Sequence, residues 1–436
     1  MSRPVAADRD TGMAPLVQVG LYLLIASIPF EYPERSIPLE IPTLTGAVFL
    51  LTTLFHPRAC YARVPMAVLW FAAYLAVFLV AVAASGSDYS SPAISEFIVV
   101  LQGVLVLLAA GNLMQDESVA RRSMVTLMAA CAVRAALPLL GFAKTSSAVW
   151  TGGERVSALG QNANNAAMIL AAGLVALIGL TFIRRSRSRL RFIITALLGA
   201  LLGLAVLETG SRGGLVSLLG GMLVFALAAD SLRARLRNGA IAVLAISLLA
   251  FATVRLPVMK NRLEDSMKTG NMAGREQLYP ALWTMFLERP VLGWGPVANT
   301  YELSQRIGER ERPARAAHNI VLELLTATGL IGTAPFLVGA WLCVRGAWQA
   351  RRGEHGVLPL ALFASVLLAN MSGDWIASKL VWLVLAYALA SGSWPAPAAR
   401  LRMASDRVRR QLGVNGPASL AGAPAAALAL PLGGER

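Results

Sequence analysis

Two arginines stand in sequence contexts that suit the binding of an anion. Arg212 lies in the turn E-T-G-S-R-G-G, residues 208–214, and Arg275 follows Gly274 at the predicted start of a helix, a favourable place for an anion. A guanidinium stays charged at any relevant pH and offers paired donors that match phosphate oxygens. The two glycines after Arg212 leave room for a ligand or another backbone. Taken singly, each position also fits an arginine that extends to lipid headgroups or solvent.

A histidine and an asparagine open a later apolar run, A-A-H-N-I-V-L-E-L-L. Asn319 is a natural N-cap for a helix that starts there. The positive end of that helix favours the neutral form of His318, and a neutral imidazole can accept a proton from a hydroxyl. Because a lone histidine is more often structural than catalytic, the interpretation of His318 as a general base depends on the two arginines.

Two further segments supply candidate binding residues. The segment G-G-E-R-V-S-A-L-G-Q-N-A-N-N, residues 152–165, places Arg155 and Asn164 before an apolar run. Asparagines there cap a helix or bond to sugar hydroxyls, and capping is the commoner role. Trp294 lies in R-P-V-L-G-W-G-P, which predicts a tight turn. Arg134 lies inside an apolar run, where a charge is costly unless it faces a cavity or a partner.

Several familiar chemistries lack their residues. Walker-type, G-x-S-x-G and H-E-x-x-H motifs are absent from the sequence, which disfavours a nucleotide-driven pump and a serine hydrolase. The nearest match to paired carboxylates, Glu309 and Glu311 in G-E-R-E-R, fits a solvated charge run. The three cysteines are far apart, which argues against a zinc site or a disulfide framework. We therefore expect no metal and no other cofactor.

The composition is that of a membrane protein. Of 436 residues, 56% are hydrophobic and 14% charged, and the mean hydropathy is +0.61. The net charge of +15 does not indicate a nucleic-acid partner, because the basic residues lie in short runs between apolar stretches. We expect contact with membrane lipid and none with nucleic acid.

About twelve apolar runs predict spans, several of them short: 14–30, 38–55, 64–84, 92–111, 123–142, 163–183, 192–207, 214–229, 239–256, 318–344, 357–370 and 380–394. Most arginines and lysines fall in alternate connecting segments, so the positive-inside rule places those segments and both termini in the cytoplasm. The segments 143–162, 208–214 and 257–317 then face outward. His56 and His355 fall on the cytoplasmic side, which leaves His318 as the outward histidine.

The predicted fold is an all-α polytopic integral membrane domain over residues 1–394. A large, partly helical periplasmic loop, 257–317, joins spans nine and ten, and a mostly disordered cytoplasmic tail covers 395–436. Within the loop, Arg275 to Glu288 predicts an amphipathic helix. It either lies on the lipid interface, with Trp283 and Trp294 as anchors, or packs its apolar face on the bundle.

The order of these motifs resembles the O-antigen ligase and polymerase superfamily, bacterial inner-membrane glycan transferases. The resemblance covers about residues 150–335 and rests on Arg155 with Asn164, S-R-G at 211–213, G-R at 274–275, G-W-G at 293–295, and H-N followed by G-L-I-G at 318–332. Each motif is weak alone, but their order and their shared outward side are jointly specific.

The resemblance implies a metal-independent glycosyltransferase that moves a glycan from undecaprenyl diphosphate to an acceptor hydroxyl on the periplasmic side. Arg212 and Arg275 would hold the diphosphate, and His318 would act as general base. Residues that would contribute to substrate binding are Arg155, Asn164, Asn319 and Trp294. The implied partners are the lipid-linked donor and an acceptor, either the lipid A core or a growing glycan.

The sequence leaves alternatives open. Within the family, we favour the ligase-like branch of lipopolysaccharide or surface polysaccharide assembly, with an O-antigen or exopolysaccharide polymerase second and protein glycosylation less favoured. From another class, an anion or solute transporter remains, because Arg134 and Glu96 lie inside apolar runs.

Overall fold

The computed structural model describes residues 15–31, 40–147, 154–158, 161–183, 188–229, 231–256, 274–309, 313–373 and 376–394, with a few isolated positions between 260 and 268. Residues Met1–Trp394 form one compact unit. The predicted tail, 395–436, lies outside the described residues, so its disorder and cytoplasmic place stay predictions.

Every apolar run predicted as a span is a helix in the structure. These helices are α1 (Pro15–Ser27), α2 (Ile41–Leu54), α4 (Met66–Ala84), α5 (Ser90–Leu113), α6 (Glu117–Ala136), α7 (Ala163–Ile183), α8 (Arg189–Glu208), α9 (Arg212–Leu227), α10 (Leu232–Arg255), α14 (Ile320–Ala350), α15 (Leu358–Asn370) and α16 (Lys379–Ser391). Among the described residues, seven helices are long and apolar enough to cross a membrane, and the others in this set are shorter. The helical, polytopic architecture is therefore confirmed, whereas a count of about twelve spans stays a prediction.

The remaining elements are short. They are η1 (Ile28–Phe30), α3 (Pro57–Cys60), η2 (Ser87–Tyr89), η3 (Leu137–Leu140), α12 (Arg275–Glu288), α13 (Ala298–Arg306) and the strands β1 (Ala143–Ser147) and β2 (Glu154–Ala158). The strands pair antiparallel, with Ala143 opposite Ala158. This hairpin was not predicted, because strands this short carry too little alternation to register as a pattern. The predicted loop helix from Arg275 to Glu288 is confirmed.

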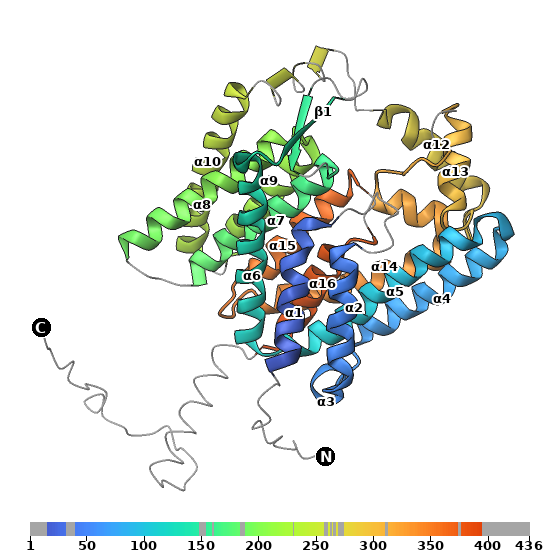
Figure 1. Cartoon of the computed structure of the whole chain (residues 1–436), viewed down its shortest axis with the longest axis horizontal. Coiled ribbons are helices and arrows are strands. Elements are labelled where there is room, and N and C mark those ends of the chain that lie inside the picture. Colours follow the sequence, from blue (N-terminus) through green and yellow to red (C-terminus); the bar gives the residue numbers. More distant parts are fainter. Residues whose placement is uncertain are drawn as a thin grey trace, which may run out of the picture. The chain divides into compact units, whose positions relative to one another are not determined.

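The core surrounds α16, which lies in the middle of the helices (Figure 1) and buries nearly every side chain. Trp382 is fully buried, and its ring meets Phe71 edge-on at 5.2 Å. Its indole nitrogen donates to the carbonyl of Ile376 at 2.8 Å. α5 packs closely here because Gly103 has no side chain: a Cβ there would lie 2.3 Å from that nitrogen.

A break in α14 receives the turn that follows α12. At Gly329 the backbone leaves the helical conformation, with φ 60° and ψ −163°. The turn 290–295 supplies the missing partners: Trp294 N donates to Thr326 O at 2.7 Å, and Leu330 N donates to Pro290 O at 2.8 Å. The part of α14 after the break, residues 330–350, is about 30 Å long at 1.5 Å per residue, which matches the hydrocarbon thickness of a bilayer.

Glycine is required at this break. A Cβ on Gly329 would lie 2.2 Å from the carbonyl oxygen of Val291, and its backbone conformation is one that glycine alone adopts readily. We expect Gly329→Ala to lower the free energy of unfolding by about 3 kcal/mol or more, because strain and overlap add. Thermal unfolding of the purified protein in detergent measures the change as a lower Tm.

Gly239→Ala in α10 is the matched control. A Cβ at Gly239 meets nothing within 4 Å, so alanine there should leave Tm unchanged or raise it slightly. Equal Tm values for the two variants would contradict the packing of the turn 290–295 against the break at Gly329.

Candidate active site

The start of α9 is joined to the start of α7. Arg212 is the first residue of α9, and the Ser211 side chain caps the helix by accepting from Gly214 N at 3.1 Å. The Ser211 hydroxyl donates to Asn164 Oδ1 at 2.9 Å. Asn162 caps α7 by accepting from the backbone of Asn164 at 2.8 Å. The asparagine segment and the S-R-G turn therefore meet.

The glycines after Arg212 bring two neighbours close. A Cβ on Gly213 would lie 1.9 Å from Ser372 Oγ, and one on Gly214 would lie 2.3 Å from Ala167 Cβ. The prediction that these glycines allow close approach is confirmed, and the approaching groups are protein side chains. Ser372 directly follows α15 and its cap Met371, so the end of α15 lies against the S-R-G turn.

Arg275 reaches the same residue from the loop. It is the first residue of α12, and its Nη2 donates to the carbonyl oxygen of Ser372 at 3.0 Å. Arg275 thus contacts the backbone of Ser372, while Gly213, next to Arg212, packs against the side chain of Ser372. Two arginine-bearing helix starts that are far apart in sequence therefore meet at one residue.

Tyr279 connects His318 to this point. Its hydroxyl lies 3.3 Å from the carbonyl oxygens of both His318 and Met371, to one of which it donates at a time. His318 has φ 52°, and Asn319 after it caps α14 by accepting from Val321 N at 3.0 Å. The predicted cap is confirmed, and the backbone of His318 is fixed beside the end of α15.

Trp294 has a structural position. Its indole nitrogen donates to the Met285 carbonyl at 2.8 Å. The guanidinium carbons of Arg289 and Arg306 lie 3.9 Å and 4.9 Å from the centroid of its ring. Arg306 Nη1 donates a hydrogen bond to Glu288 Oε1 at 2.8 Å. Trp294 packs on the small core of the loop: Leu278, Leu282, Met285, Leu303 and Ala317. Its role in substrate binding stays a prediction.

Arg155 lies on β2, where it pairs with Ser146 of β1. β2 is the last element before α7, so Arg155 precedes the Asn164 segment closely in the sequence. Its predicted binding role stays a prediction.

A buried polar network next to the site was missed, apart from Arg134. Arg134 is 3% exposed and donates to Gln161 Oε1 at 2.7 Å, and Gln161 in turn donates to the Glu31 carbonyl. The Glu31 carboxylate accepts from Ser378 Oγ at 2.6 Å and from the backbone of Lys379 at 2.8 Å. The network ties the starts of α7 and α16 to the end of η1. The sequence offered one signal for this network: Lys379 is a single lysine at the start of the last apolar run.

A third arginine, Arg315, lies beside the start of α12 and was also missed. Its Nη2 is 4.0 Å from where a Cβ of Gly274 would stand, and its Nη1 lies 3.4 Å from Glu309 Oε1. Its Nε has no hydrogen-bond partner among the described residues. Arg315 precedes His318 by only three residues. That short distance in the sequence could have indicated that Arg315 lies near the site.

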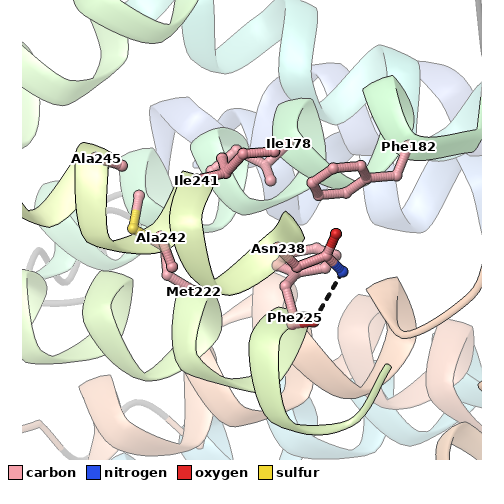
Figure 2. A pocket seen from close by; sticks show the side chains of 8 residues that line it. All are labelled: Ile178, Phe182, Met222, Phe225, Asn238, Ile241, Ala242 and Ala245. Atoms are coloured by element: carbon pink, nitrogen blue, oxygen red, sulfur yellow. Dashed lines mark hydrogen bonds between the residues drawn. The ribbon is translucent and has the colours of Figure 1, made fainter. Parts of the chain in front are cut away.

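Figure 2 shows a crevice between α7, α9 and α10 that is distinct from this site. Asn238 crosses it and donates to the Phe225 carbonyl at 2.9 Å. Phe225 lies near the end of α9, about 20 Å along the axis from Arg212 at its start. The lining is otherwise apolar: Ile178, Phe182, Met222, Phe225, Ile241, Ala242 and Ala245.

These features define a polytopic helical membrane protein in which the Arg275 side chain, the turn that bears Arg212 and, through Tyr279, the backbone of His318 converge on the end of α15. Residues 197–337 match the family profile described as O-antigen ligase, and this match confirms the predicted resemblance to the O-antigen ligase and polymerase superfamily. The match includes Arg212, Arg275, Trp294 and His318, and it supports a glycosyltransferase of the ligase or polymerase type with lipid-linked glycan substrates. A comparison with curated proteins gives no match.

The ion pair that orders the loop predicts a pH dependence. Hydrogen bonds from Arg306 hold the pKa of the Glu288 carboxyl below its usual value. A lowered folded-state pKa stabilises the protein above the unfolded pKa of about 4.3, and this stabilisation is lost as the pH falls through the folded-state value. Glu288→Gln should therefore lower Tm at pH 7, and the difference from wild type should shrink as the pH falls below about 4.3 and vanish only below the folded-state pKa.

Thermal unfolding across this pH range checks the expectation. Gln277→Ala, at an exposed position on the same helix, is the control: it removes no titratable group, so its Tm difference from wild type should not change with pH. A Tm difference for Glu288→Gln that persists at low pH would contradict the assigned ion pair.

Proposed function

We propose that this protein transfers a glycan from undecaprenyl diphosphate to an acceptor hydroxyl at the periplasmic face of the bacterial inner membrane, as an O-antigen ligase does. One observation carries the proposal: Arg275 and the turn that bears Arg212 both contact Ser372, and Tyr279 links the His318 backbone to Met371 beside it. The family match over residues 197–337 supports the same reaction.

The reaction balances without an added ion. The acceptor oxygen attacks the anomeric carbon as the bond from that carbon to the diphosphate oxygen breaks, and the electron pair leaves on the diphosphate. His318 takes the proton of the acceptor hydroxyl. Arg212 and Arg275, with Arg315 near the start of α12, stabilise the charge that develops on the leaving group. Attack from the face opposite the diphosphate inverts the anomeric centre.

Asn164, Asn319, Arg155 and Trp294 are proposed to help bind the substrate. Asn164 is the best supported, because its side chain bonds the serine next to Arg212. We place both termini in the cytoplasm and the site outside, on the charge distribution of the connecting segments. Residues 1–394 would form the membrane domain, with 257–317 as its periplasmic loop.

The proposed donor and acceptor can be tested by glycan analysis. In a strain that lacks the chromosomal copy, plasmid-borne His318→Ala should reduce transfer by about 100-fold or more relative to wild type, because the general base is lost. Gel separation of capped lipid A core, uncapped core and carrier-linked polymer measures the transfer.

The gel pattern also separates the family branches. Full-length polymer accumulated on its carrier, with uncapped core, is the result expected for a ligase. Single repeat units alone would identify a polymerase instead. Normal glycan in both the deletion strain and the His318→Ala strain would exclude this reaction and favour the transporter.

The geometry of the arginines gives a second prediction. Arg212→Lys keeps the charge but loses the paired donors, so we expect at least about a tenfold loss of transfer by the purified protein. Arg345→Lys, at an exposed position in the later part of α14, is the control and should retain activity. Chelator should leave the wild-type rate unchanged. Normal transfer by Arg212→Lys would remove the diphosphate assignment, and a requirement for divalent metal would contradict the metal-free mechanism.

A further inference from the structure

An exposed apolar surface crosses α12, the turn after it and the restart of α14. We call it the α12–α14 patch. Its members are large hydrophobic side chains between about half and three-fifths exposed: Trp283 50%, Leu287 59%, Val291 58%, Leu330 53% and Ile331 51%. A helix outside the predicted spans normally exposes polar side chains, so a contiguous apolar surface here requires an explanation.

The patch is continuous in space. Trp283, Leu287 and Val291 follow one another at spacings of four, which places Trp283 and Leu287 on one face of α12 and Val291 just beyond its end. The Val291 carbonyl accepts from Ile331 N at 3.2 Å, so the turn and α14 are joined at the patch. Trp283 also contacts Phe286, with ring centroids 5.3 Å apart.

The packing of α12 on the loop core and on α14 does not use this patch. Leu278, Leu282 and Met285, on the other side of the helix, are buried and supply that contact. The interpretation that the apolar face of this helix packs on the protein is therefore confirmed for the face of Leu278, Leu282 and Met285. One face packs on the protein, and the other is exposed.

Membrane lipid is the expected contact of the patch, because the patch continues into the exposed apolar surface of α14. α14 is a candidate membrane span, and Leu337, 46% exposed, and Trp341, 63% exposed, extend its apolar surface beyond Leu330 and Ile331. Side chains on that stretch face lipid if α14 crosses the bilayer. The patch lies at the end of this stretch where residues 330–350 begin, next to the exposed Arg289, and tryptophan and arginine are typical of the headgroup level.

We propose that α12 rests on the membrane surface through the α12–α14 patch, with Trp283 and Leu287 inserted at the headgroup boundary. Arg275 begins the same helix, so the patch holds its guanidinium close to the headgroup level. That is the depth at which the diphosphate of a lipid-linked donor lies, and this consequence rests on the proposed function. The membrane contact itself does not.

Depth measurement by spin labelling tests the contact in the full-length protein. The native cysteines Cys60, Cys131 and Cys343 are buried, so a label directed to an added exposed cysteine is selective. Leu287→Cys and Ile331→Cys report on the patch. Thr284→Cys on α12 and Gln305→Cys on α13, both at exposed polar positions, are the matched controls. The protein is placed in nanodiscs of phosphatidylglycerol and phosphatidylethanolamine.

We expect labels at 287 and 331 to collide several-fold more often with oxygen, which concentrates in lipid, than with a water-soluble nickel chelate. The labels at 284 and 305 should show the reverse. Equal nickel accessibility at all four positions would overturn the proposal. Exclusion of both reagents at 287 would indicate a protein partner, or a second copy, and would also overturn it.

A transfer assay separates this inference from the proposed function. Leu287→Gln should weaken use of a long-chain donor presented in bilayers and leave a short-chain donor presented in water unaffected. Equal loss with both donors would place Leu287 in the site itself and count against a membrane contact. Absence of transfer by wild type with either donor would reject the proposed function, while the spin-label result would still decide the membrane contact.

Discussion

The seating of one backbone turn in a broken helix determines the arrangement of the candidate site. At Gly329, α14 loses its own hydrogen bonds, and the turn 290–295 replaces them through its own amides and carbonyls. Unpaired backbone groups are costly in an apolar environment, so the break and the turn stabilise one another. The turn follows α12 directly, and the first part of α14 begins two residues after His318, with Asn319 between them as the cap. Fixing the turn therefore fixes Arg275 and His318 with respect to each other.

The site is assembled from helix ends, which are the places where a helical bundle has backbone groups to spare. Ser211, Asn162 and Asn319 cap the starts of α9, α7 and α14, and Ser372 follows the end of α15. Small residues let these ends approach, as Gly213 and Gly214 do. The buried network around Glu31 pins the start of α7 from the other side. The position of Arg212 therefore depends on helix caps, glycines and a buried network that lie in other elements.

The sequence predicted what is local. Apolar runs located the helices, Asn319 was identified as a cap, and α12 was predicted as an amphipathic helix, because each signal lies within a few residues. The contacts of Tyr279 with Met371 and of Glu31 with Ser378 join residues that are distant along the chain, and no local pattern encodes them. The hairpin and the break at Gly329 were not predicted from the sequence for a related reason. Each is stabilised by a partner segment, so its own residues carry only a weak signal.

The placement of cations at helix starts is itself an argument about the ligand. Arg212 and Arg275 are each the first residue of a helix, where the dipole disfavours a positive charge by about 0.3–1 kcal/mol. The structure offsets this for Arg275 with the carbonyl of Ser372, which lies past the negative end of α15. An anion between these helix starts would be favoured by the arginines and by both dipoles at once, so their energies add. A diphosphate is such an anion, and in the proposed reaction its charge grows as the glycosidic bond breaks, which is when this arrangement would stabilise it most.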